Sequence, residues 1–97
     1  MRKIILSSEA LREAANCLKA LSHPTRLHII QLLCGQSRSV GEIAEECGIP
    51  HNLASTHLKV LERCRLLKSH RNGRSVEYEV IEKHLFELMR CIGKRFS

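Results

Sequence analysis

The sequence predicts one mainly α-helical domain that carries a small β-hairpin. Residues 39–67 indicate a short helix, a tight turn at Gly48 and a second helix whose outward face is first polar and then basic. Residues 70–74, His-Arg-Asn-Gly-Arg, form a basic turn between two short runs of strand character. Together these are the parts of a winged helix-turn-helix. A chain of 97 residues provides one modest core, so we expect a single domain over residues 1–97.

The first third of the chain predicts two helices. Ser7 or Ser8 can cap a first helix that continues to about residue 21, because apolar residues recur there at helical spacing. Pro24 suits the first turn of a second helix, where its missing N–H is not needed. That helix is expected to end at Gly35.

The helix-turn-helix follows a polar loop, which we predict over residues 36–38. Ser39 and Glu42 have the spacing of a capping box, in which each side chain accepts from a free backbone N–H of the other residue. This pattern predicts a short helix that starts here and stops at the glycine turn. Pro50 then begins the next helix, which continues to about residue 63.

The last third predicts the wing and a final helix. Two strands over residues 68–71 and 75–80 are expected to join at the dipeptide Asn72-Gly73, a strong hairpin signal. The final helix begins at about residue 82. Its apolar stripe consists of Leu85, Leu88, Met89, Ile92 and Phe96.

The helix over residues 51–63 has an apolar and a polar face on a helical wheel. His57 falls in the apolar arc, which predicts a partly buried, hydrogen-bonded histidine rather than a ligand. The polar face carries almost no acidic residue, so we expect it to contact DNA bases and phosphates rather than to be only a solvated face. The predicted contacts on this helix are His51, Asn52, Ser55, Thr56 and Lys59.

Basic residues outside this helix point to the same partner. Arg71 and Arg74 flank the hairpin tip, and Arg38 precedes the helix-turn-helix as a further phosphate candidate. The net charge of +6 favours a polyanion such as double-stranded DNA. The alternative is a winged helix used as a protein-interaction module, whose basic face binds an acidic protein.

Three further expectations concern location and chemistry. No apolar run approaches the roughly 18 residues of a membrane span, and the apolar N-terminal stretch is too short for a signal peptide. We therefore expect a cytoplasmic protein without a membrane partner, whose five cysteines are reduced. The chain shows no nucleophile-base set and no Gly-rich phosphate loop, so we do not expect an enzyme.

With these motifs the chain resembles the ArsR/SmtB family of dimeric winged-helix repressors. Four segments carry the resemblance, residues 21–27, 40–44, 55–61 and 71–78, and it covers about residues 10–92. The resemblance implies a homodimer joined by the first and last helices, and a repressor that leaves a palindromic operator when an inducer binds. It also implies base or phosphate contacts at His51, Asn52, Ser55 and Thr56. Because residues 50–53 depart from the family's usual start of this helix, the operator sequence cannot be borrowed.

Inducer sites in this family are often metal or thiol sites. The arsenic-type Cys-x-Cys is absent, since residues 40–42 are Val-Gly-Glu. Glu82 and His84 match the first half of the zinc- and cobalt-type motif, but Arg95 stands where its second histidine belongs.

Two other candidates for an inducer site remain, a stripe on the final helix and a pair of cysteines. His84, Glu87 and Cys91 share one face of the final helix, so two such stripes across a dimer could hold a soft or borderline metal ion. The plainer interpretation is a solvated helix edge. Cys17 and Cys91 form a candidate redox pair if the dimer brings them close together. We expect the remaining cysteines, Cys34, Cys47 and Cys64, to pack in the core.

Overall fold

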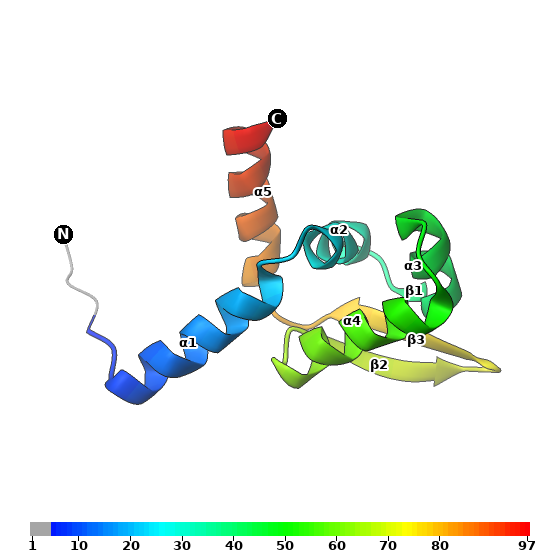
Figure 1. Cartoon of the computed structure of the whole chain (residues 1–97), viewed down its shortest axis with the longest axis horizontal. Coiled ribbons are helices and arrows are strands. Elements are labelled where there is room, and N and C mark those ends of the chain that lie inside the picture. Colours follow the sequence, from blue (N-terminus) through cyan, green and yellow to red (C-terminus); the bar gives the residue numbers. More distant parts are fainter. Residues whose placement is uncertain (1–4) are drawn as a thin grey trace.

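The computed structural model describes residues 5–97 and has the mainly helical architecture with a hairpin that the sequence predicts (Figure 1). In chain order its elements are α1 (Ser8–Leu21), α2 (Pro24–Leu33), β1 (Arg38–Ser39), α3 (Val40–Cys47), α4 (His51–Arg63), β2 (Leu67–Asn72), β3 (Ser75–Val80) and α5 (His84–Phe96). Helices α3 and α4 form the helix-turn-helix, and β2 with β3 forms the wing.

Local capping explains where the first three helices begin. The Ser7 hydroxyl accepts from the Ala10 N–H at 3.0 Å, which confirms the cap of α1. At α2, Pro24 occupies the first turn and His23 Nδ1 accepts from the Thr25 N–H at 3.1 Å. Both hydrogen bonds of the capping box between Ser39 and Glu42 are present, at 3.1 and 2.9 Å.

The sheet has one strand more than the sequence predicts. Its order is β1-β3-β2, and both pairings are antiparallel. Arg38, which we expected in a loop, belongs to β1, where it pairs with Tyr78 of β3. A two-residue strand has no pattern of its own, because only its distant partner makes it a strand. The predicted two-stranded wing is present, and β1 adds a third strand to its sheet.

The wing turn is also shifted by one residue from the prediction. Asn72 pairs with Ser75, so the two central residues of the turn are Gly73 and Arg74 rather than Asn72 and Gly73. Gly73 has φ +65°, and a positive φ at the first central position is the pattern of a type II′ turn. Asn72 stays in the strand, where its amide donates to Glu77 Oε2 at 3.1 Å. The shift places Arg74 in the turn itself.

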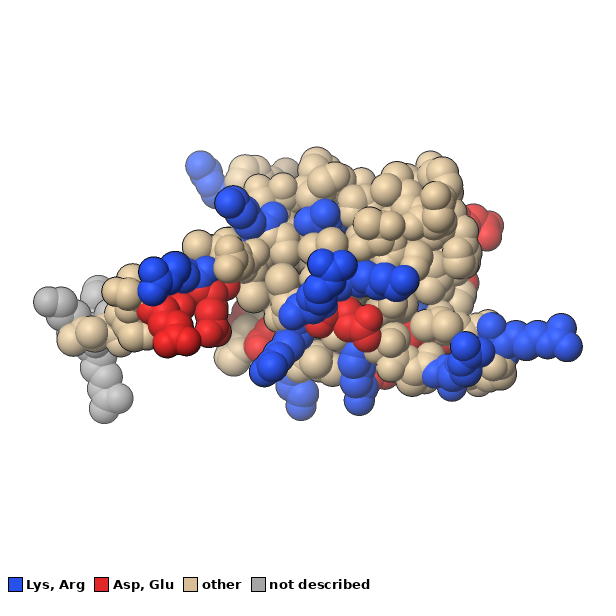
Figure 2. Space-filling view, turned by 60° about the horizontal axis from the view of Figure 1, so that its bottom comes forward, with Lys and Arg blue, Asp and Glu red and all other residues tan. Residues whose placement is uncertain are grey.

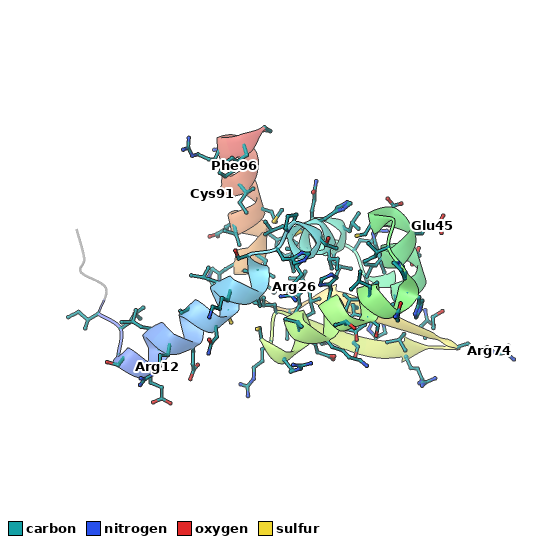
Figure 3. The ribbon with its side chains drawn as sticks, viewed as in Figure 1. Arg12, Arg26, Glu45, Arg74, Cys91 and Phe96 are labelled. Atoms are coloured by element: carbon teal, nitrogen blue, oxygen red, sulfur yellow. The ribbon has the colours of Figure 1, made fainter. Side chains whose placement is uncertain are left out.

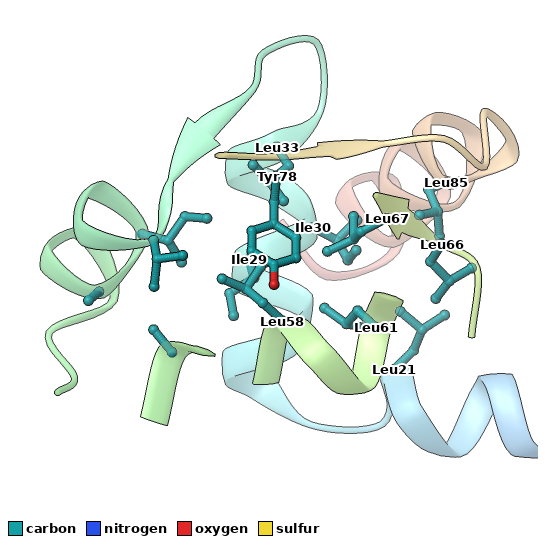
Figure 4. Packing of buried hydrophobic residues seen from close by; sticks show 14 residues of the cluster. Leu21, Ile29, Ile30, Leu33, Leu58, Leu61, Leu66, Leu67, Tyr78 and Leu85 are labelled. Carbon is teal, nitrogen blue, oxygen red and sulfur yellow. The ribbon is translucent and has the colours of Figure 1, made fainter. Parts of the chain in front are cut away.

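The core lies where α2, α3 and α4 meet the sheet (Figure 4). Tyr78 brings its ring inward from β3, beside the leucines and isoleucines of the helices. Burial of each large apolar side chain contributes about 1.5–3 kcal/mol. The largest fully buried side chains are Ile29, Ile30, Leu33, Ile43, Leu58, Leu61 and Leu67.

Helices α1 and α5 extend away from this core (Figure 1). Both carry large apolar side chains that are exposed in the single protomer, such as Leu11 and Leu18 on α1 and Phe86 and Phe96 on α5. None of the helices within residues 5–97 has the length and apolar character needed to cross a membrane.

Candidate nucleic-acid interface

Helix α4 has the two faces that the helical wheel predicts. Ala54, His57, Leu58 and Leu61 are buried against the core. On the other side Ser55 is half-buried, and the remaining predicted contacts are exposed: His51, Asn52, Thr56 and Lys59. The structure thus places all five predicted residues of this helix on its outward side.

An open concavity of about 460 Å³ lies between the outward face of α4 and the wing. His51, Ser55 and Lys59 line it from α4, and Arg74 lines it from the wing turn. Figure 2 shows lysine and arginine side chains projecting along this side of the molecule, and Figure 3 places Arg74 at the end of the wing. A helix and a basic loop therefore frame a single surface.

The start of α4 adds a positive end to this surface. Its N-cap is Pro50, whose side chain accepts no hydrogen bond from the first turn. The first turn of a helix carries unpaired N–H groups and the positive end of the helix dipole, both of which favour a phosphate. His51 and Asn52 stand directly at this end.

Two of the predicted contacts already hold hydrogen bonds within the protein. The Thr56 hydroxyl donates to the Asn52 carbonyl oxygen at 3.0 Å, so its proton is used inside the helix. Arg38 is half-buried, and its Nε donates to the Leu32 carbonyl oxygen at 3.1 Å, which ties β1 to the end of α2. The contact of Arg38 with Leu32 gives this residue a structural role that the sequence pattern does not indicate.

His57 is a core histidine, as predicted, and it joins three helices. It is 6% exposed, and its Nδ1 accepts from Arg26 Nε of α2 at 3.1 Å. Arg26 also donates through Nη1 to the Ala20 carbonyl oxygen of α1 at 3.1 Å, and the His23 ring lies 4.7 Å from that of His57. Burial, and then the nearby His23 and Arg26, lower the pKa of His57 below its ordinary 6.5. Sequence reasoning missed Arg26 and His23 as partners, because neither is near His57 in the chain.

The candidate metal stripe on α5 is not assembled within one protomer. His84 is exposed and its Nδ1 lies 2.6 Å from Glu82 Oε1, which raises the pKa of His84 and lowers that of Glu82. Across residues 5–97 no three histidine, cysteine or acidic side chains lie close enough together to hold a metal ion. A site built on His84, Glu87 and Cys91 would need ligands from a second protomer.

The cysteines fall into two groups. Cys34, Cys47 and Cys64 pack against the core, as predicted, and burial raises the pKa of all three thiols. Cys17 lies beside Cys64, with its Sγ donating to the Cys64 carbonyl oxygen at 3.8 Å, while Cys91 is exposed on α5 (Figure 3). Within one protomer, then, the neighbour of Cys17 is Cys64. The Cys17–Cys91 pair was predicted across two protomers and stays a prediction.

The sequence is similar to known regulatory proteins of bacteria. The sequence model of the bacterial regulatory proteins of the arsR family matches residues 23–69. The transcriptional regulator NmtR from Mycobacterium tuberculosis is 33% identical over 84 residues, which cover 87% of this chain and 70% of that protein. The repressor SmtB from the same organism is 33% identical over 81 residues, or 84% of this chain. The chain spans 60% of the length of SmtB.

A solved structure has the same fold. The homodimeric winged helix-turn-helix DNA-binding domain Mb0332 from Mycobacterium bovis is 28% identical, with a TM-score of 0.80. The match covers 95% of this chain and 91% of that domain. These relatives are regulators of transcription, which agrees with the expectation that the chain is not an enzyme.

Proposed function

The chain belongs to the ArsR family of bacterial regulatory proteins, and from this premise we propose that it is a homodimeric repressor of transcription that binds a palindromic DNA operator. The observation that supports this most directly is the shared concavity of α4 and the wing, lined by His51, Ser55, Lys59 and Arg74. As a regulator that acts on DNA, the protein would work in the cytoplasm.

In this proposal α4 enters the major groove with its N-terminal end foremost. Asn52 is exposed there and can pair in two ways with an adenine edge, while Ser55 donates or accepts at a base. Lys59 lies further along the helix and meets a phosphate. Arg71 and Arg74 of the wing hold the adjacent backbone.

The dimer follows from the apolar faces of α1 and α5. Leu11 and Leu18 are 54% and 62% exposed, and Phe96 is 77% exposed, so a lone protomer leaves large apolar side chains in water. A second copy of the chain would cover them by twofold symmetry. Two α4 helices would then read two half-sites about one helical turn of DNA apart, roughly 34 Å.

The proposed inducer is a soft metal ion or a thiol-reactive signal. A metal would be held by His84, Glu87 and Cys91 of both protomers, since one protomer supplies too few ligands. The proposed inducer is tested by adding zinc, cadmium or arsenite to the protein–DNA complex. We expect one of them to release the DNA.

Binding to DNA is tested first with the wild-type chain. Fluorescence anisotropy would compare a duplex from the promoter of the protein's own gene with a shuffled duplex of equal length, at several salt concentrations. We expect preference for the promoter duplex and an affinity that falls steeply with salt, because contacts to phosphates release counterions. A chain that bound neither duplex would instead fit the role of a protein-interaction module.

Paired substitutions then separate sequence reading from phosphate binding. Asn52→Ala is expected to reduce the preference for the promoter duplex by roughly tenfold, since a bidentate base contact contributes about 1–3 kcal/mol. Arg74→Ala is expected to weaken binding to both duplexes equally and to lower the salt slope by about 1. Lys83→Ala removes one positive charge from an exposed position that lies outside α1, α4, α5 and the wing, and it is the charge control. If Asn52→Ala and Arg74→Ala both left affinity for the promoter duplex unchanged, α4 and the wing would not be the binding surface.

A further inference from the structure

Cys17 and Cys64 form a thiol pair that the proposed DNA contacts do not use. Cys17 comes from α1, and Cys64 is the residue that caps the end of α4. The Cys17 thiol donates to the Cys64 carbonyl oxygen at 3.8 Å. Residues 47 positions apart in the chain are thus in direct contact.

The Cys17–Cys64 pair borders an open part of the surface. Cys17 and Cys64 both line an open concavity of about 390 Å³, together with Arg63 and Arg65 at the end of α4. Cys64 also packs against the hydrophobic core, as Cys34 and Cys47 do. A small solute can enter this concavity, which Glu13 also lines beside the two arginines.

We propose that Cys17 and Cys64 form a reversible intramolecular disulfide when the protein meets a hydroperoxide, and that this bond changes the affinity of α4 for DNA. The second half of this statement rests on the proposed function, whereas the formation of the bond does not.

The chemistry needs one peroxide for each pair. The Cys17 thiolate attacks one peroxide oxygen, the O–O bond breaks, and the hydroxide that leaves is protonated to water. The Cys64 thiolate then attacks the sulfur of the Cys17 sulfenic acid, the S–O bond breaks, and a second water forms. Two thiols and hydrogen peroxide become one disulfide and two waters, with two electrons passing from sulfur to oxygen.

The order of the two steps follows from the environment of Cys64. Burial and the neighbouring Cys17 raise the pKa of the Cys64 thiol, although Arg26 and Arg63 act in the opposite direction. A raised pKa leaves little Cys64 thiolate at neutral pH, so we assign Cys64 the resolving step. It becomes reactive once Cys17 holds a sulfenic acid against it.

The bond would tie the recognition helix to a proposed dimer helix. Cys64 ends α4, and Arg65 directly after it adopts a left-handed conformation with φ +61°. A covalent link at this point restrains the position and angle of α4 relative to α1. Because α1 belongs to the proposed dimer interface, the link would alter the relative placement of the two α4 helices that read the half-sites.

The bond itself is tested on the wild-type chain treated with hydrogen peroxide. Peptide mapping by mass spectrometry is expected to find the Cys17 and Cys64 peptides joined, and dithiothreitol is expected to separate them. A non-reducing gel should show a monomer band, because the link lies within one chain. A Cys17–Cys91 link that gave a disulfide-bonded dimer, or no link to Cys64, would overturn the proposal.

The effect on DNA is tested with matched serine variants. Peroxide is expected to change the affinity of the wild-type chain for its operator at least fivefold, and Cys17→Ser and Cys64→Ser are expected to abolish this response. Cys34→Ser, which removes a half-buried cysteine outside the pair, should respond as the wild type does. A linked protein with unchanged affinity would refute the regulatory role. If the reduced chain bound no DNA, the proposed function would fail while the mapping still decided whether the bond forms.

Discussion

At the scale of single residues, His57 decides how the recognition helix is held. Its Nδ1 accepts a hydrogen bond from Arg26, so this nitrogen carries no proton. The helical wheel placed His57 inside correctly, since its position depends only on helical spacing. Its partners His23 and Arg26 could not be predicted, because the contact between them depends on how α2 crosses α4. The same reason hid the contact between Cys17 and Cys64.

The lowered pKa of His57 predicts that stability falls on acidification. The unfolded chain takes up a proton at this residue near pH 6.5, whereas the folded chain resists it until a lower pH. The stabilisation that depends on a neutral His57 is therefore fully present above pH 6.5. It is lost as the pH falls below that value. Urea unfolding at pH values on both sides of this point measures the effect, and His57→Gln should flatten the dependence because the amide keeps an acceptor without titrating.

His84 provides the control for this prediction, with the opposite sign. Its pKa is raised by the hydrogen bond and charge of Glu82, so its contribution is present at low pH and is lost as the pH rises through its folded pKa. Because His84 is fully exposed, His84→Gln should change the pH dependence far less than His57→Gln does. If His57→Gln kept the acid sensitivity of the wild type, the buried histidine would not be its source.

At the scale of elements, local signals predicted boundaries well and pairings poorly. The starts of α1, α2 and α3 follow from side chains within three residues, such as the capping box at Ser39 and Glu42. Strand β1 was missed because its pairing partner Tyr78 lies far along the chain. The wing turn was misplaced by one residue because Asn72-Gly73 and Gly73-Arg74 both suit a two-residue hairpin, and the strand register selects between them.

The end of α4 offers a prediction about stability. The Arg65 N–H donates to the Glu62 carbonyl oxygen and the Leu66 N–H to that of Leu61, at 2.9 and 3.2 Å, which is a Schellman motif. Arg65 occupies the left-handed position of this motif, where glycine is favoured. Arg65→Gly is expected to raise the free energy of unfolding by about 0.5–1 kcal/mol, as measured by urea denaturation.

Arg65→Ala separates backbone strain from charge. Alanine keeps the Cβ that disfavours the left-handed conformation, so this variant should gain no stability. If alanine stabilised the protein as much as glycine, removal of the charge beside Arg63 would be the cause and the strain argument would fail.

At the scale of the whole molecule, the proposed dimer explains why α1 and α5 extend from a small core (Figure 1). Leu11 and Leu18 lie seven residues apart on one stripe of α1, and both are more than half exposed. Leu18→Glu would place a charge in the twofold interface on each protomer, and every lost leucine contact costs about 1.5–3 kcal/mol. We expect this variant to be monomeric in analytical ultracentrifugation and to bind the operator weakly, since one protomer reaches only one half-site.

Ile81→Glu is the matched control, because Ile81 is 42% exposed but lies outside α1 and α5. A dimer that survived Leu18→Glu would place the interface elsewhere, and the half-site spacing derived from α1 and α5 would then not hold.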